Sequence, residues 1–182
     1  MKATRFQQSG CHTINIYAMD ESRFGLLSIQ RRCLTARGVK PLILYQHQFR
    51  NFYLFGGYSP LNGDHYTLEM PWCNTDCFQE YLSGFSKHRP EEFKILILDN
   101  GAFHKARRLN IPSNIALLFL PPYSPELNPA EMIWRYIKDR LANKHFPHLE
   151  QLSERVMHIL REMTADIIQS ITGWKLYQNC IY

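Results

Sequence analysis

The sequence lacks the long hydrophobic segments that membrane insertion and secretion require. No apolar run in its 182 residues approaches the ~20 residues of a membrane span, and residues 1–8 contain no apolar core of a signal peptide. Internal repeats, low-complexity tracts and flexible linkers are also missing. We therefore expect a cytoplasmic protein without membrane contacts, built as a single domain over residues 1–182.

Cysteine is scarce, and its number is odd. The five cysteines are scattered through a chain without a secretion signal, so reduced thiols are expected. Cys73 and Cys77 resemble half of a zinc site, but no second ligand pair stands at a usual spacing. No cysteine or serine has a recognisable nucleophile setting. Disulfide scaffolds, zinc modules and covalent catalysis are therefore disfavoured.

Hydrophobic residues make up 45% of the chain and charged residues 20%, which is typical of a globular protein. The net charge of +5 is compatible with a polyanion as partner but raises that expectation only modestly. On a helix, Glu131, Arg135 and Lys138 would share one face and carry a basic track. A solvated Glu–Arg pair is the alternative. The candidate DNA contacts are Arg31, Arg32, Arg37, Lys105, Arg107, Arg135 and Lys138.

Two aspartates follow apolar runs that are typical of buried strands. Residues 95–98 are continuously apolar and lead to Asp99, while the largely apolar residues 14–19 lead to Asp20. If the two strands pair in parallel, these carboxylates stand about one strand spacing apart, ~4.8 Å. Carboxylates that close repel each other unless they are protonated or bridged by a cation.

A third acid stands at the expected start of a helix. Asn128, Pro129 and Glu131 occupy positions typical of an N-cap, the first helical residue and the third. The side chain of Glu131 would then either cap the Asn128 N–H or join the two aspartates. Three carboxylates suit a pair of Mg²⁺ or Mn²⁺ ions, because oxygen-only ligand sets favour these ions over zinc.

Three segments resemble the acidic motifs of the IS630 branch of the Tc1/mariner transposase superfamily. They are residues 19–22, 98–104 and 121–131, and the last, containing Pro-Pro-Tyr-Ser-Pro-Glu-Leu-Asn-Pro, is the most specific. The resemblance covers nearly the whole chain from about residue 14. It implies an RNase H-like fold and a catalytic, metal-binding triad of Asp20, Asp99 and Glu131. The spacing between the last two acids is slightly shorter than is usual in that family.

The resemblance also points to supporting residues. Asn100, His104 and Asn128 fall on its second and third motifs and are candidates for a second layer around the metals. His104 would orient a metal-bound water or contact a phosphate, although a local cap or surface role is an equal alternative.

The remaining pattern agrees with an α/β, RNase H-like mixed five-stranded sheet flanked by helices, with extra C-terminal helices. Strands are expected near 14–20, 52–58, 65–70, 94–99 and 115–120, with helices at 75–87, after 128, and twice within 149–182. The crossover helix makes the fourth strand parallel to the first. We also expect one or two helical turns within 105–110 and a short hairpin within 21–50 that carries arginines towards DNA.

By this resemblance the chain is a DDE catalytic domain that cleaves DNA at transposon ends and joins the free 3′-OH to target DNA, at TA dinucleotides, in a prokaryotic cytoplasm. The first catalytic strand begins so early that no helix-turn-helix domain is expected before it. A separate N-terminal DNA-binding protein or reading-frame product would then recognise the ends, and homodimerisation is left open. The alternatives are a non-transposing DNA-binding or regulatory relic and a host RNase H-like nuclease.

Overall fold

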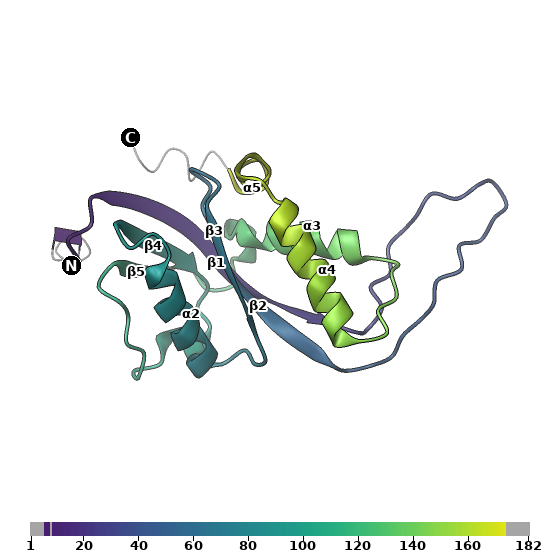
Figure 1. Cartoon of the computed structure of the whole chain (residues 1–182), viewed down its shortest axis with the longest axis horizontal. Coiled ribbons are helices and arrows are strands. Elements are labelled where there is room, and N and C mark those ends of the chain that lie inside the picture. Colours follow the sequence, from purple (N-terminus) through teal and green to yellow (C-terminus); the bar gives the residue numbers. More distant parts are fainter. Residues whose placement is uncertain (1–5, 8, 174–182) are drawn as a thin grey trace.

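A five-stranded mixed sheet forms the centre of the computed structural model, which describes residues 6, 7 and 9–173 (Figure 1). The strand order is β3-β2-β1-β4-β5. The strands are β1 (Thr13–Gly25), β2 (Asn51–Tyr58), β3 (His65–Met70), β4 (Glu92–Leu98) and β5 (Ile115–Phe119). The helices are α2 (Thr75–Lys87), α3 (Ala130–Leu141), α4 (Leu149–Glu162) and α5 (Ala165–Thr172), with 3-10 turns η1 (Ala102–Lys105) and η2 (Pro125–Leu127).

The central strand β1 joins the antiparallel and parallel halves of the sheet. It pairs with β2 in antiparallel fashion from Ala18 to Gly25 and with β4 in parallel fashion from Thr13 to Ala18. The crossover through α2 returns the chain for a parallel partner, as the sequence predicted. The meander of β1, β2 and β3 and the parallel neighbours β4 and β5 are likewise confirmed.

Helices cover both faces of the sheet (Figure 1). On one face, Tyr17 and Met19 of β1 pack into a core cluster with Phe78 and other residues of α2. On the other face, Ala18 belongs to a cluster with Trp134 and other residues of α3, α4 and α5. Because strand side chains alternate between faces, the next two residues of β1 also point to opposite sides. This alternation separates Asp20 from Glu21.

Among the described residues, the most exposed segment is 27–50 between β1 and β2, which we call the arm. It contains no helix or strand and projects beyond the helices (Figure 1). At its base the Ser28 N–H donates to the Gln46 carbonyl, 3.2 Å away. Leu34 and Leu42 are fully exposed on it. The predicted short hairpin within 21–50 is wrong, because the arm contains no strand. The pairing of β1 with β2 ends at Gly25 and Asn51, where the arm leaves the sheet.

The predicted helical turns within 105–110 are also wrong. The structure has the 3-10 turn η1 at Ala102–Lys105, and Ala106 is already extended. Since β5 pairs directly beside β4, a short irregular connection is enough to join them.

The two C-terminal helices α4 and α5 are confirmed within the described residues, whereas 174–182 lie outside them. None of the described helices is long and apolar enough to span a membrane.

Candidate active site

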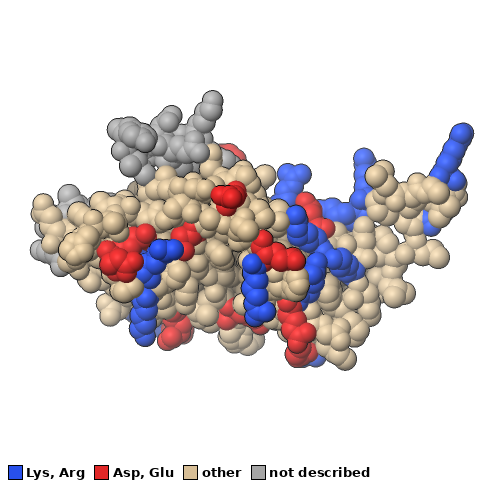
Figure 2. All heavy atoms as spheres, turned by 45° about the horizontal axis from the view of Figure 1, so that its top comes forward, with Lys and Arg blue, Asp and Glu red and all other residues tan. Residues whose placement is uncertain are grey.

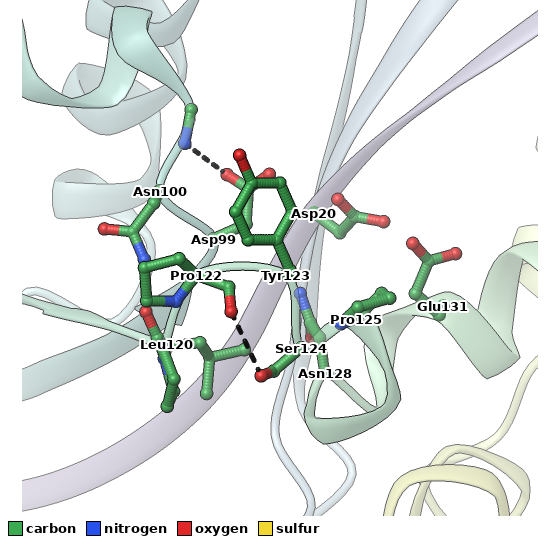
Figure 3. A pocket seen from close by; sticks show the side chains of 12 residues that line it. Asp20, Asp99, Asn100, Leu120, Pro122, Tyr123, Ser124, Pro125, Asn128 and Glu131 are labelled. Atoms are coloured by element: carbon green, nitrogen blue, oxygen red, sulfur yellow. Dashed lines mark hydrogen bonds between the residues drawn. The ribbon is translucent and has the colours of Figure 1, made fainter.

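Three acids from three separate elements line one pocket of about 430 Å³. Asp20 comes from β1, Asp99 directly follows β4, and Glu131 lies in the first turn of α3 (Figure 3). The rest of the lining comes from the turn after β4 and from the proline-rich loop before α3: Asn100, Gly101, Leu120, Pro121, Pro122, Tyr123, Ser124, Pro125 and Asn128.

Asp20 is held from the α3 side of the sheet. Its Oδ2 accepts a 2.8 Å hydrogen bond from Nε1 of Trp134. Burial, together with the nearby carboxylates of Glu21 and Glu131, raises the pKa of Asp20 to about 8, although hydrogen bonds from the backbone and from Trp134 oppose this. A cation among these carboxylates would relieve both the repulsion and the cost of burying a charge.

Asp99 is more open to solvent, and within residues 6, 7 and 9–173 only its Oδ1 has a polar partner. The side chain is 61% exposed. Its Oδ1 accepts a 2.9 Å hydrogen bond from the Gly101 N–H (Figure 3) and lies 2.9 Å from Nδ1 of His104.

Glu131 is exposed at the pocket. The alternative of a capping side chain finds no support, because the Asn128 N–H already donates to the Pro125 carbonyl, 2.9 Å away. Glu131 is therefore available to the pocket rather than occupied in holding its own helix.

Asn128 ties the loop before α3 to the sheet. Its side-chain amide donates a 2.9 Å hydrogen bond to the Met19 carbonyl of β1, and its Oδ1 accepts from the Ala130 N–H at 3.2 Å. The N-cap position itself is taken by Pro129, one residue later than predicted. Asn128 thus places the start of α3 beside Asp20.

The other two predicted supporting residues also lie around Asp99. Asn100 lines the pocket, and its side chain bonds the Leu120 carbonyl and the Lys105 ammonium group. His104 is only 3% exposed, so a surface role is excluded. Its ring meets carboxylates rather than the open pocket.

The donor chemistry of the pocket fits a hard divalent cation. Carboxylate oxygens are the ligands that Mg²⁺ and Mn²⁺ prefer, and the raised pKa of Asp20 marks a place where uncompensated negative charge is unfavourable. Within residues 6, 7 and 9–173, no three His, Cys, Asp or Glu side chains converge on one metal position.

The predicted DNA-contacting residues come from three parts of the chain: the arm, the segment from the end of η1 to Arg107, and α3. Figure 2 shows Lys and Arg gathered on the half of the molecule that carries the arm. Arg32 and Arg37 lie on the arm and are exposed. Arg107, which follows η1, and Arg135, on α3, are exposed as well. Arg31 pairs with Asp139 at 3.0 Å, and Lys105 lies over the Phe119 ring. Lys138 is half-buried with its ammonium group over Phe24.

Sequence reasoning missed three residues of this region. Glu21 was overshadowed by its neighbour Asp20, although strand alternation would have placed it on the opposite face. Trp134 was interpreted as packing, and it is indeed buried, but it also bonds Asp20. Tyr123 is fully exposed at the pocket, with a left-handed backbone φ of 58°; no local signal distinguished it from the rest of its motif.

Comparisons with known proteins agree with this architecture. A model of the DDE superfamily endonuclease family matches residues 15–153. An uncharacterized protein of Sinorhizobium fredii, y4pE/y4sA, is 37% identical over 102 residues, which are 55% of this chain and 76% of that protein.

Solved structures show the same fold. Mos1 transposase in a paired-end complex with the left transposon end aligns with a TM-score of 0.67 at 17% identity, over 97% of this chain and 55% of that one. A pre-cleavage Mos1 transpososome aligns with a TM-score of 0.68 at 16% identity, over 97% of this chain and 56% of the Mos1 chain. The HTLV-2 integrase catalytic core domain in complex with magnesium aligns with a TM-score of 0.51 at 9% identity, over 88% of this chain and 99% of the integrase chain.

The chain thus spans little more than half the length of the Mos1 chains, and the likeness confirms the predicted RNase H-like fold. The family match extends over most of the chain, from within β1 into α4. The chain therefore belongs to the DDE superfamily endonucleases, and its fold is similar to that of the Mos1 transposase structures.

Proposed function

We propose that this chain is the catalytic domain of a transposase, which cleaves DNA phosphodiester bonds at transposon ends and joins the freed 3′-OH to target DNA at TA dinucleotides. The observation that carries the proposal is the meeting of Asp20, Asp99 and Glu131 in one pocket. The three side chains come from a strand, a strand end and a helix start, so their meeting depends on the whole fold.

Asp20, Asp99 and Glu131 would hold two Mg²⁺ or Mn²⁺ ions. Asp20 and Asp99 would share the ions, and Glu131 would complete the ligand set of one of them. When bound, such ions activate the attacking oxygen and stabilise the leaving oxygen of an in-line displacement. Mos1 paired-end complexes have been solved with Mn and with Mg, which supports this choice of cations.

The chemistry needs no covalent intermediate with the protein. In cleavage, a water oxygen bonds to phosphorus, the bond from phosphorus to the 3′ oxygen breaks, and that oxygen leaves as a hydroxyl after gaining a proton. In joining, the same hydroxyl attacks a target phosphodiester, and one P–O bond forms as another breaks. The carboxylates orient the reacting groups, while Arg32, Arg37, Arg107 and Arg135 offer exposed positive charge to the DNA backbone.

DNA is the proposed partner, and residues 1–182 act as one domain. The similar Mos1 structures are a paired-end complex, a strand transfer complex and a pre-cleavage transpososome. Because this chain spans about half of those chains, recognition of transposon ends would come from residues outside this sequence or from a separate DNA-binding protein. A homodimer would bring two ends together.

The test is Mn²⁺-dependent nicking of supercoiled plasmid, with Mn²⁺ binding measured by calorimetry in the presence of a short DNA duplex. Asp99→Asn should abolish both, while its melting temperature stays near that of the wild type, because the side chain is largely exposed. Asp76→Asn is the matched control, since Asp76 is an exposed aspartate outside the pocket. Equal nicking by the Asp99 variant and the wild type would refute the proposal.

A further inference from the structure

His104 is fixed beside the candidate active site by aromatic packing. Its side chain is 1% exposed, and its ring centroid lies 4.6 Å from that of Phe78 on α2 and 4.1 Å from that of Phe103. A ring held on two sides cannot reorient freely, so its two nitrogens point in set directions.

Both nitrogens face carboxylates. Nε2 lies 2.9 Å from Oε1 of Glu21, whose side chain is only 8% exposed. Nδ1 lies 2.9 Å from Oδ1 of Asp99. The second contact is close but is not aligned as a hydrogen bond, and among the described residues Nδ1 has no other partner. His104 therefore joins a buried acid to an exposed acid.

Gly101 makes this close approach possible. A Cβ at this position would lie 3.0 Å from Nδ1 of His104 and 3.1 Å from Oδ1 of Asp99, so any side chain would push the two apart. The Gly101 N–H also donates to the same Oδ1. With Oδ1 engaged from two directions, Oδ2 is the oxygen that has no hydrogen bond within the described part of the chain.

Glu21 lies on the face of β1 opposite to Asp20 and is connected to Asp99 through the His104 ring. It therefore supports the pocket through His104 without lining it. Burying a carboxylate is costly unless it is paired, and His104 supplies that partner. The two adjacent acids of β1 thus serve the same site in different ways.

We propose that Glu21 and His104 are positioning residues that fix the carboxylate of Asp99 for binding a divalent cation. The inference rests on the proposed function, since it assumes that Asp99 is a metal ligand. Groups that orient a metal ligand from behind change metal affinity by about 10-fold to 100-fold when they are altered.

The experiment compares Mn²⁺ binding by the full chain, measured by calorimetry with a short DNA duplex, for Glu21→Gln, His104→Gln and Gly101→Ala. Glu21→Gln keeps the size and one acceptor oxygen, so it is the variant expected to retain the fold. His158→Gln is the matched control, because His158 also pairs with an acid, Glu162 at 3.3 Å, but is exposed far along α4.

We expect about tenfold weaker Mn²⁺ binding for Glu21→Gln and His104→Gln, a weakening in the same direction for Gly101→Ala, and less than a twofold change for His158→Gln. In plasmid nicking, the Mn²⁺ concentration at half-maximal rate should rise by a similar factor. A loss of folded protein would instead lower the maximal rate and leave that midpoint unchanged.

The outcomes separate the two proposals. If Asp99→Asn abolishes Mn²⁺ binding while Glu21→Gln and His104→Gln bind like the wild type, the positioning role is refuted and the proposed function stands. If the wild type and Asp99→Asn are alike, the proposed function itself fails. If His104→Gln does not fold, Glu21→Gln decides, measured well below its melting temperature.

Discussion

The indole Nε1 of Trp134 donates a 2.8 Å hydrogen bond to Oδ2 of Asp20, and this bond links the helix that carries Glu131 to the central strand. Trp134 stands one turn after Glu131 on α3 and is 2% exposed. The relative position of the first and third acids is therefore set by a buried side chain as well as by the loop before α3.

Trp134→Phe should weaken Mn²⁺ binding several-fold, because the ring still fills the core while the donor to Asp20 is lost. The cost in stability should be about 1–3 kcal/mol, because the largely buried Asp20 carboxyl loses its donor. Calorimetry and thermal melting measure the two effects. Trp72→Phe, at an exposed tryptophan, serves as control, and unchanged Mn²⁺ binding in Trp134→Phe would show that the bond does not orient Asp20.

Asp20→Asn should stabilise the metal-free chain at neutral pH. The pKa of Asp20 is raised to about 8, so the folded state disfavours the ionised form, and stability falls as the pH rises from about 4 towards 8. The variant should melt higher than the wild type at pH 7 in EDTA, by roughly 1–3 kcal/mol, and the gap should shrink towards pH 4. A variant that is less stable at every pH would contradict this account.

Glu131→Gln should affect activity and leave stability nearly unchanged, whereas Asn128→Ala should lower stability. The glutamine variant should lose Mn²⁺-dependent nicking with little change in melting temperature, because Glu131 is exposed. The alanine variant should lose about 1–3 kcal/mol of stability, since it leaves the Met19 carbonyl without its buried donor. Full activity in Glu131→Gln would rule it out as a metal ligand.

At the hairpin between β2 and β3, Asp64 should make the fold acid-sensitive. Burial raises the pKa of Asp64, but hydrogen bonds from Tyr17, His88 and Arg89 outweigh it, and the pKa is lowered. A lowered carboxyl pKa stabilises the fold above the unfolded value, ~3.9, and that stability is lost as the pH falls through the folded value.

Asp64→Asn should therefore cost about 1–3 kcal/mol at pH 7 and progressively less below pH 4, as followed by urea denaturation. Asp76→Asn is the control, because Asp76 is 75% exposed and makes one surface ion pair. A constant difference between wild type and the Asp64 variant across this range would contradict the assignment.

Tyr123→Gly should separate DNA handling from stability. Tyr123 is fully exposed and has a left-handed φ of 58°, which glycine adopts without strain. The variant should be at least as stable as the wild type by thermal melting, yet nick plasmid several-fold more slowly, because the pocket loses its exposed aromatic ring. A wild-type nicking rate would show that the ring does not contact DNA.

The sequence predicted those parts of the fold that have strong local signals. Residues 95–98 form the C-terminal half of β4, because a continuous apolar run is buried on both faces of the sheet. Helix α2 begins after Asn74, whose side chain accepts from the Cys77 N–H. The end of β4 before Asp99 was predicted, whereas β1 continues five residues beyond the predicted end at Asp20, to Gly25. Asp20 and Asp99 could still be placed in one region, because the predicted parallel pairing of β1 with β4 brings these two positions side by side.

The parts that escaped prediction depend on contacts between distant residues. The arm has no periodic pattern, so its lack of regular structure could not be distinguished from a short hairpin. The link from Glu21 through His104 to Asp99 depends on the ring of Phe78 on α2, which packs against the imidazole. The sequence around residue 104 contains no signal that predicts this contact. Asn128 was assigned to a helix cap, but its amide is used to hold β1.

The alternation of Asp20 and Glu21 on β1 makes the candidate active site dependent on strand register. A shift of β1 by one residue would move Asp20 and Glu21 to the opposite faces of the sheet. Asp20 would then leave the pocket and Glu21 would leave His104. Pairing with β2 on one side and β4 on the other opposes such a slip from two directions. A one-residue insertion or deletion ahead of Asp20 would thus inactivate the site more thoroughly than many substitutions within it.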